Sequence, residues 1–315
     1  MNLFKGKIFG LNLVHLPKNT RMISILIPTY NYDVFPLVEN LYNQCKKADI
    51  LFEILVFDDA SQNHFNNPRI NELENSSFKV LDKNIGRSAI RNLLAKTAKY
   101  EWLLFLDADV IPMHNKLINN YLKKIHSGEK IIYGGIRYQE ERPSDNQLLR
   151  WVYGNKREAI TASERAKEEH LSFLTLNFLI HKTVFDSVRF NEEIPNLRNE
   201  DLLFSYDLQQ AKVAIKHIDN PVYHLGIETS EIFIRKTEEG VISFLFLWNN
   251  NLLPYHYTPF GKAFTLINKL KIRKIIAFFF SMIKSAMLKN LNSTKPSMFV
   301  YDLYRLGYLC SLKSR

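Results

Sequence analysis

Short apolar runs alternate with amphipathic segments through the first half of the chain, and this alternation limits the fold more than any other feature. The apolar runs are ISILIPTY (23–30), FEILVFDDAS (52–61), FKVLD (78–82), WLLFLDAD (102–109) and KIIYGGIRY (130–138). Leu37, Val38, Leu41 and Cys45 recur at helical spacing after the first run, and GRSAIRNLLAKTA (86–98) is a second helical segment. Strands that alternate with helices of this length predict an α/β fold with right-handed crossovers and a mostly parallel sheet.

Acidic residues gather where two of these runs end. Asp58 and Asp59 close the second run, and Asp107 and Asp109 close the fourth. In open parallel sheets, ligands bind beyond the carboxyl ends of the strands. Side chains alternate along a strand, so Asp107 and Asp109 are expected on one side, with the small Ala108 between them. Two adjacent carboxylates repel each other, and Mg²⁺ or Mn²⁺ bridging a diphosphate would remove that cost. The alternative is an acidic strand end that caps a helix or pairs with a lysine.

Length and composition fit one large domain, or one domain plus an extension. The 315 residues are 46% hydrophobic. The two cysteines, Cys45 and Cys310, lack metal-ligand spacing, which indicates a reducing, cytoplasmic location. Residues 1–21 have no sustained apolar core, so we expect a lead-in segment and no signal peptide. No run approaches the roughly 20 apolar residues of a membrane span.

The net charge of +10 is concentrated in the C-terminal part. No acidic residue occurs between Glu239 and Asp302, a segment that contains Lys262, Lys269, Lys271, Arg273, Lys274, Lys284, Lys289 and Lys295. This asymmetry predicts a boundary near residue 230 and a basic, mainly helical extension over residues 231–315. It also indicates an anionic partner for that extension.

Five segments of residues 22–230 together resemble an inverting family 2 glycosyltransferase. They are ILIPTYN, FDDAS, NIGRSAIRN (84–92), LDAD and NEDLLFSYDL (199–208), in the family's order and approximate spacing. Ile90 stands where the family often has alanine. The resemblance implies a GT-A fold, in which a mostly parallel, Rossmann-like sheet is flanked by helices. It implies a donor half over about residues 22–140 and an acceptor half over about 141–230.

The activity that this resemblance implies is metal-dependent transfer of a sugar from a nucleotide-diphosphate-sugar to a hydroxyl group. The acceptor would be a glycan or a lipid-linked molecule, in the synthesis of a cell-surface polysaccharide or glycoconjugate. The donor-binding residues would be Pro28, Thr29, Tyr30, Asp58, Asp59, Gly86, Arg87, Arg91 and Asp107. Arg91 would either contact the diphosphate or form an internal salt bridge with Asp58 or Asp59.

The metal and the catalytic base come from the same resemblance. Asp109 would bind Mn²⁺ or Mg²⁺ directly, and Asp107 would contact the metal or the ribose. His224 either completes the metal site, which would favour Mn²⁺, or has a structural role. Asp201 would take the proton of the attacking hydroxyl, with Glu200 as the competing assignment. Acids at this position also suit the start of a helix without any catalytic role.

Two acceptor-side residues complete the assignment. Asn177, in TLNFLIHK, falls where the acceptor wall of the resembling enzymes lies. Trp151 ends QLLRW, which spells the Gln-x-x-Arg-Trp motif of processive polysaccharide synthases. In those enzymes the motif follows the base, whereas here it precedes Asp201. We interpret the match as chance, with Trp151 either packed in the fold or stacked on a sugar.

The basic extension has two interpretations. Residues 262–289 include apolar residues at helical spacing, but the apolar run between Lys274 and Lys284 is too short to span a bilayer. Either this helix packs on the catalytic domain with a solvated lysine face, or it lies on an anionic lipid surface. The second interpretation would make the protein peripheral on the inner face of the cell membrane.

Three other classes of function compete with sugar transfer. A nucleotidyltransferase would carry a Gly-rich, basic loop after the first strand, and PTYNYDVFP is not such a loop. Nucleic-acid binding has no zinc finger, RNA-recognition motif or basic–aromatic interleaving to support it, so we expect no nucleic-acid partner. A catalytically inactive binding protein of the same fold is disfavoured by the joint presence of Asp107, Asp109 and Asp201.

Overall fold

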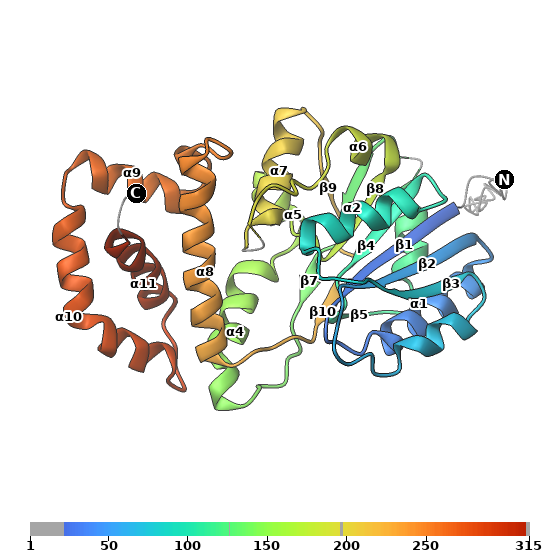
Figure 1. Cartoon of the computed structure of the whole chain (residues 1–315), viewed down its shortest axis with the longest axis horizontal. Coiled ribbons are helices and arrows are strands. Elements are labelled where there is room, and N and C mark those ends of the chain that lie inside the picture. Colours follow the sequence, from blue (N-terminus) through green and yellow to red (C-terminus); the bar gives the residue numbers. More distant parts are fainter. Residues whose placement is uncertain (1–21, 126, 196–197, 313–315) are drawn as a thin grey trace, which may run out of the picture.

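The computed structural model describes residues 22–125, 127–195 and 198–312 and confirms the α/β fold (Figure 1). The predicted lead-in, residues 1–21, lies outside the described residues. The strands are β1 (Met22–Thr29), β2 (Leu51–Asp58), β3 (Ser76–Val80), β4 (Trp102–Leu106), β5 (Val110–Pro112), β6 (Ile131–Tyr133), β7 (Ile136–Arg137), β8 (Asn177–His181), β9 (Lys216–His217) and β10 (Val222–His224). The α-helices before the extension are α1 (Phe35–Ala48), α2 (Arg87–Thr97), α3 (Leu117–Leu122), α4 (Leu148–Tyr153), α5 (Ala162–Arg165), α6 (Lys182–Ser187) and α7 (Glu200–Gln210).

The central sheet has seven strands in the order β3-β2-β1-β4-β8-β6-β9. Strands β3, β2, β1 and β4 are parallel, whereas β8 runs antiparallel to both β4 and β6. In β1 and β2, Thr29 pairs with Asp58, so the two strands end at the same level. A second sheet of three strands, β5-β10-β7, carries the segments that follow β4 and β6. The predicted mostly parallel sheet of GT-A type is therefore confirmed.

Alternation along the strands divides the core into two layers. Ile25 and Ile27 of β1 point to the layer formed with α1 and α3, while Leu26 between them points to the layer formed with α2, α6 and α7. The helical spacing noted in the sequence accounts for one of these contacts, because Leu37 and Leu41 are buried on the inner side of α1. Both faces of the sheet are thus covered, and its carboxyl edge remains for a ligand.

The predicted fifth strand, residues 130–138, is two strands that belong to different sheets. Gly134 and Gly135 separate β6 from β7, and Gly135 has a φ of +92°. A Cβ at residue 134 would lie 2.5 Å from the Tyr121 hydroxyl group, so the backbone approaches its neighbours too closely for a side chain. The glycine pair lets the chain leave the central sheet and enter the small one.

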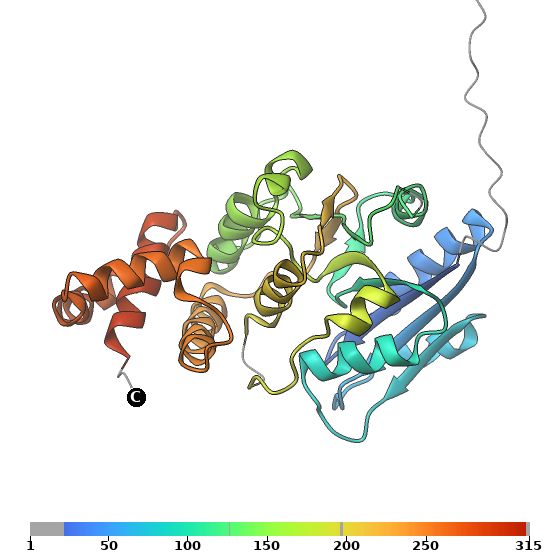
Figure 2. The same cartoon turned by 90° about the horizontal axis from the view of Figure 1, so that it is seen from above.

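The extension is helical, as predicted, and stands beside the α/β domain (Figures 1 and 2). It contains α8 (Ser230–Asn249), α9 (Pro259–Lys269), α10 (Arg273–Leu291) and α11 (Met298–Ser311). Leu203 of α7 and Leu149 of α4 are buried in apolar clusters made largely of extension residues. Helices α8 and α11 pack against each other, and α10 packs on α11. The extension is therefore anchored on α4 and α7, beside the carboxyl edge of the sheet.

Candidate active site

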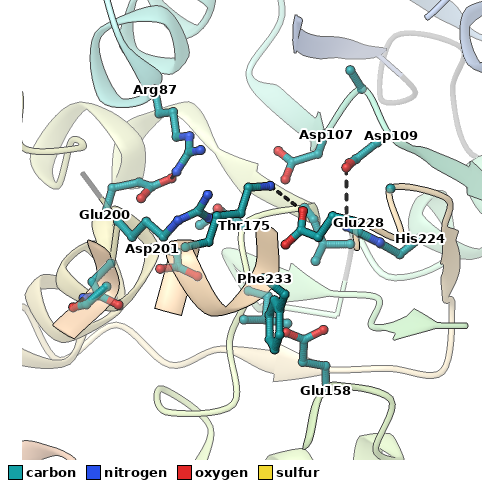
Figure 3. Close-up of a pocket in the computed structure, with 18 of the residues that line it drawn as sticks. Arg87, Asp107, Asp109, Glu158, Thr175, Glu200, Asp201, His224, Glu228 and Phe233 are labelled. Atoms are coloured by element: carbon teal, nitrogen blue, oxygen red, sulfur yellow. Dashed lines mark hydrogen bonds and ion pairs between the residues drawn. The ribbon is translucent and has the colours of Figure 1, made fainter. Parts of the chain in front are cut away.

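A cavity of about 510 Å³ opens where β1, β2 and β4 end, and elements from both parts of the chain line it. One side comes from the strand ends and the start of α2. The other comes from the start of α7, from α4 and from α8 and α11 of the extension. Figure 3 shows acidic side chains from both sides pointing into this space. The predicted residues that line it are Pro28, Thr29, Tyr30, Asp59, Arg87, Arg91, Asp107, Asp109, Glu200, Asp201 and His224.

The two adjacent aspartates at the end of β2 have different surroundings. Asp59 lines the cavity, and its carboxylate accepts hydrogen bonds from the backbone N–H groups of Ile85 (2.7 Å) and Gly86 (3.0 Å). Asp58 is 1% exposed and accepts a hydrogen bond from the N–H of Ser61 at 2.7 Å. Consecutive residues point in opposite directions at a strand end, so only one of the pair faces the cavity. The predicted donor contact of Asp58 is thereby corrected, because its carboxylate stabilises the loop that follows β2.

Gly86 has a positioning role outside the cavity lining. Its φ is +86°, a conformation that favours glycine, and it is the residue immediately before α2. Its N–H is held by Asp59. This contact fixes where α2 begins, and hence where Arg87 and Arg91 enter the cavity.

Arg91 connects the strand side of the cavity to the α7 side. Its Nη2 lies 2.8 Å from Asp107 Oδ1, and its Nη1 lies 3.7 Å from Glu200 Oε1. Arg87 Nη1 is 3.8 Å from the same oxygen of Glu200. The predicted internal salt bridge of Arg91 exists, but its partner is Asp107 rather than Asp58 or Asp59. Burial raises the pKa of Asp107, and the charge of the Arg91 guanidinium opposes that rise, so the pairing favours the ionised form of Asp107.

The side chains of Asp109 and His224 lie close together where β5 and β10 of the three-stranded sheet pair. His224 Nε2 lies 3.4 Å from Asp109 Oδ2, as the dashed line in Figure 3 marks. Asp109 is the residue immediately before β5, and His224 is the last residue of β10. They are adjacent because His224 pairs with Val110 in the antiparallel ladder. Gly226 leaves room for them, since a Cβ there would lie 2.2 Å from Asp109 Oδ2. His224 Nδ1 is buried without a hydrogen-bond partner among the described residues.

A divalent cation fits this pair only with help from a ligand. Among the described residues, no group of three or more His, Cys, Asp or Glu side chains could hold a metal ion by itself. Asp109 and His224 offer one carboxylate and one imidazole, and Asp107 has one oxygen that Arg91 does not occupy. Mg²⁺ and similar ions are commonly held by one or two carboxylates together with substrate phosphates. The donor set therefore fits a metal that is completed by a diphosphate.

Asp201 is presented at the start of α7 by an unusual backbone conformation. Asn199, the residue before the helix, has a φ of 72°, and its side chain donates to the Gly240 carbonyl group of α8 at 2.9 Å. Asparagine tolerates this left-handed region better than most residues. Burial, followed by the charge of Glu200, raises the pKa of Asp201 to about 6. Its Oδ1 accepts a hydrogen bond from the Leu202 N–H at 2.8 Å.

The two predicted acceptor residues do not line the cavity. Asn177 is fully buried: its side-chain amide donates to the carbonyl groups of Gly135 (2.9 Å) and Asn220 (3.0 Å) and accepts from Tyr121 (2.7 Å). It stabilises the glycine turn between the sheets, which corrects its assignment to the acceptor wall. Trp151 donates to the Gln139 carbonyl group at 2.9 Å and packs against the core. Trp151 is thus packed in the fold and lies outside the cavity lining.

The wall that the sequence did not predict surrounds Arg150, the neighbour of Trp151. The Arg150 guanidinium lies 5.3 Å from the ring centre of Phe233 on α8 and 5.9 Å from that of Tyr153. It also forms a salt bridge of 3.1 Å with Glu158. The remaining unpredicted lining includes Tyr32, Leu174, Thr175, Arg198, Glu228, Lys236, Thr237, Tyr301 and Arg305. Within the QLLRW segment, the residue that lines the cavity is Arg150 and not Trp151.

The mostly parallel sheet and its strand-end cavity, which is rich in carboxylates and arginines, agree with the GT-A glycosyltransferase fold that the sequence predicts. The family model described as "Glycosyl transferase family 2" matches residues 24–189, more than half of the chain, and the chain belongs to this family. The competing classes, nucleotidyl transfer and binding without catalysis, are thereby set aside.

Relatives of this chain carry the same general description. An "Uncharacterized glycosyltransferase" of Haemophilus influenzae is 36% identical over 94 residues, which is 28% of this chain and 29% of the relative. One of Rickettsia felis is 25% identical over 285 residues, which is 79% of this chain and 45% of the relative. The matched region thus spans less than half of the length of either relative.

Solved structures of S. aureus TarS are also similar. TarS 1–349 in complex with UDP-GlcNAc has a TM-score of 0.47 and 18% identity, covering 71% of this chain and 66% of that chain. TarS has a TM-score of 0.49 and 17% identity, covering 90% and 54% respectively.

Proposed function

We propose that this enzyme transfers a sugar from a nucleotide-diphosphate-sugar to a hydroxyl group of a glycan or lipid-linked acceptor, with inversion and with Mn²⁺ or Mg²⁺. A role in making a cell-surface polysaccharide or glycoconjugate is proposed on the basis of the family alone. The observation that carries the proposal is the position of Asp201. This carboxyl group, with a pKa raised to about 6, faces the same cavity as the arginines of α2 and the Asp109–His224 pair.

The strand side of the cavity suits the donor. Thr29, Tyr30 and Asp59 line the end where β1 and β2 finish, and this end would receive the nucleoside. Arg87 and Arg91 enter from the start of α2 and would contact the diphosphate. A metal ion held by Asp109 and His224, with the free oxygen of Asp107, would neutralise charge on the departing diphosphate. The donor sugar would then project toward α7.

Asp201 is better suited than Glu200 to act as the base. Glu200 lies within 3.8 Å of Arg87 and 3.7 Å of Arg91, so two guanidinium groups already compete for its carboxylate. Asp201 has a pKa of about 6, and it is therefore mostly ionised at neutral pH yet still able to take a proton. It would accept the proton of the acceptor hydroxyl as that oxygen attacks the anomeric carbon. A single attack with a single base inverts the configuration at this carbon.

The acceptor would lie against the wall from α4, α8 and α11. This wall combines aromatic rings, such as Phe233 and Tyr301, with the cations Arg150, Lys236 and Arg305. Aromatic faces suit the apolar side of a sugar ring, and the cations suit an acceptor that carries a carboxylate or phosphate. Lys236 is paired with Glu228, and Arg150 with Glu158, so Arg305 is the cation that we assign to such an anionic group.

The proposal is tested by a donor screen that measures release of nucleoside diphosphate with Mn²⁺, with Mg²⁺ and with a chelator. We expect Asp201→Asn to lower turnover by about 10²–10⁴-fold, the usual contribution of a general base. Asp109→Ala should raise the metal concentration needed for half-maximal rate. Full turnover in Asp201→Asn would overturn the assignment of the base, and turnover that resists both the chelator and Asp109→Ala would overturn the metal.

Asp207 provides a matched control for the base. It lies on the same helix as Asp201, and burial raises its pKa to about 6 as well, but it does not line the cavity. Asp207→Asn should therefore keep wild-type turnover. An equal loss in both variants would mean that the charge of α7, and not the proton transfer, had been measured.

A further inference from the structure

The outer side of α10 exposes a continuous set of large apolar side chains, here called the α10 face. These residues recur at helical spacing, and each is about half exposed or more: Ile275 (55%), Phe278 (62%), Phe279 (56%), Met282 (64%) and Ile283 (47%). Soluble surfaces carry single exposed apolar residues, but a contiguous patch of this kind marks a binding surface. Figure 1 shows α10 at the end of the molecule farthest from the central sheet.

The inner side of α10 is fixed, so the helix cannot rotate to bury this face. Phe280, Met287 and Leu291 are buried against the neighbouring helices of the extension. Lys284, on the same inner side, pairs with Glu238 of α8 at 3.5 Å and lies 5.9 Å from the ring centre of Tyr304. The α10 face is therefore a stable feature of the folded chain. It is also separate from the cavity, because no residue of α10 lines the cavity.

The segment that carries the α10 face has charges of one sign only. Lys274 and Lys289 are exposed on α10 itself, and Lys269 and Lys271 are exposed immediately before it. The sequence has no acidic residue between Glu239 and Asp302, so nothing on this segment neutralises the lysines. An apolar stripe bordered by lysines matches a surface that is apolar inside and anionic at its edge.

A second copy of the chain is a poor match for the same face. A twofold interface brings one patch onto itself, so the lysines of one copy would meet those of the other without an acid between them. An anionic bilayer has no such conflict, because the phosphates contact the lysines and the acyl region receives the aromatic rings. The helix would lie flat on the bilayer, since no helix among the described residues combines the length and apolar character needed to cross a membrane.

We propose that the α10 face binds the surface of an anionic lipid bilayer, with Phe278, Phe279 and Met282 inserted and Lys274 and Lys289 on the headgroups. Of the two interpretations that the sequence left open for this helix, the structure combines parts of both. The inner side packs within the protein, as the first interpretation required, and the outer side keeps the apolar residues that the second one needs. The proposal stands independently of sugar transfer, because it involves no residue of the cavity.

The test is co-sedimentation of the full chain with vesicles of phosphatidylcholine, with and without phosphatidylglycerol. We expect the chain to bind only the vesicles that contain phosphatidylglycerol, and we expect high salt to weaken this binding. Lys274→Gln/Lys289→Gln should weaken this binding about 30-fold, from the energy that each basic residue gains at an anionic surface. Phe278→Ser/Phe279→Ser should weaken it on the order of 100-fold through lost apolar burial.

Matched controls come from the α/β domain. Lys123→Gln/Lys124→Gln removes the same charge from another exposed site, and Phe65→Ser removes an exposed aromatic ring there. Both should bind like the wild type. The charge variant alters only exposed side chains, so it keeps the test valid if the aromatic variant does not fold. Nucleoside diphosphate release should stay unchanged in every variant, which separates this proposal from the enzymatic one.

Three outcomes would overturn the proposal. The first is no binding to anionic vesicles, and the second is equal binding by the α10 variants and the controls. The third is a concentration-dependent dimer that Phe278→Ser/Phe279→Ser abolishes, in the absence of vesicle binding. That result would assign the α10 face to a second copy of the chain.

Discussion

Gly226→Ala tests the Asp109–His224 pair without touching either residue. Gly226 has no positive φ, so alanine suits its backbone. The new Cβ would lie 2.2 Å from Asp109 Oδ2 and 3.2 Å from His224 Cε1, whereas ordinary contacts begin at 3.4 Å. The carboxylate must therefore move by about 1.2 Å, the difference between 2.2 and 3.4 Å. A displacement of about 1 Å at a reacting centre costs roughly 100-fold in rate, which is about 2.7 kcal/mol of transition-state stabilisation.

The assay is nucleoside diphosphate release against Mn²⁺ concentration, together with thermal unfolding. Asp109 is partly exposed and can rotate, so we expect the melting temperature to stay close to the wild-type value while the metal requirement rises. Gly240→Ala is the matched control, because Gly240 also lines the cavity but a Cβ there meets nothing within 4 Å. That control should stabilise α8 by about 1 kcal/mol and leave turnover unchanged. Wild-type kinetics in Gly226→Ala at every metal concentration would refute this view of the pair.

Three further predictions concern charge and burial. Burial raises the pKa of Asp201 from 3.8 to about 6, so the folded state loses stability as the pH rises through this window and the carboxyl group ionises. Asp201→Asn removes this ionisation and should raise the melting temperature at pH 7.5. The wild-type kcat/KM should fall below a pH of about 6, and the variant should lack this acidic limb of the pH profile. Arg91→Met leaves Asp107 and Glu200 without their shared cation and should cost about 3–5 kcal/mol in denaturant unfolding, part of which Arg91→Met/Asp107→Asn recovers. Asn177→Ala leaves the buried Asn220 carbonyl group without its amide partner, whereas the Gly135 carbonyl group keeps the Val222 N–H. The variant should cost about 2 kcal/mol with turnover per folded molecule unchanged, and a fall in turnover without loss of stability would restore Asn177 to the acceptor site.

The strand side of the site was predictable because it depends on local rules. A buried strand exposes its polar residues at its carboxyl end, and Asp107 and Asp109 needed no knowledge of distant residues to be placed there. The alternation of side chains along a strand also separates Asp59 from Asp58. Neighbouring residues at a strand end face opposite ways, so the alternation that placed Asp107 and Asp109 on one side also excludes one member of the adjacent pair.

The helical side was not predictable because it depends on packing between distant segments. Arg150 and Phe233 are far apart in the chain, and neither has a sequence pattern that indicates the other. Asn177 shows the opposite difficulty. A polar residue in an apolar strand predicts either a ligand contact or a buried hydrogen-bond network, and only the positions of Tyr121 and Asn220 decide between them.

The order of the two sides along the chain has a consequence for synthesis on the ribosome. Every predicted cavity residue, from Pro28 to His224, is translated before α8, whereas Phe233 and Arg305 follow later. Chains fold from the N-terminus as they emerge, so the sheet and its carboxylates can assemble on the nascent chain while the far wall is missing. Among the described elements, α8 and α11 therefore dock after the sheet has formed, and a nascent chain that stops before α8 lacks the cavity wall to which Phe233 and Arg305 belong.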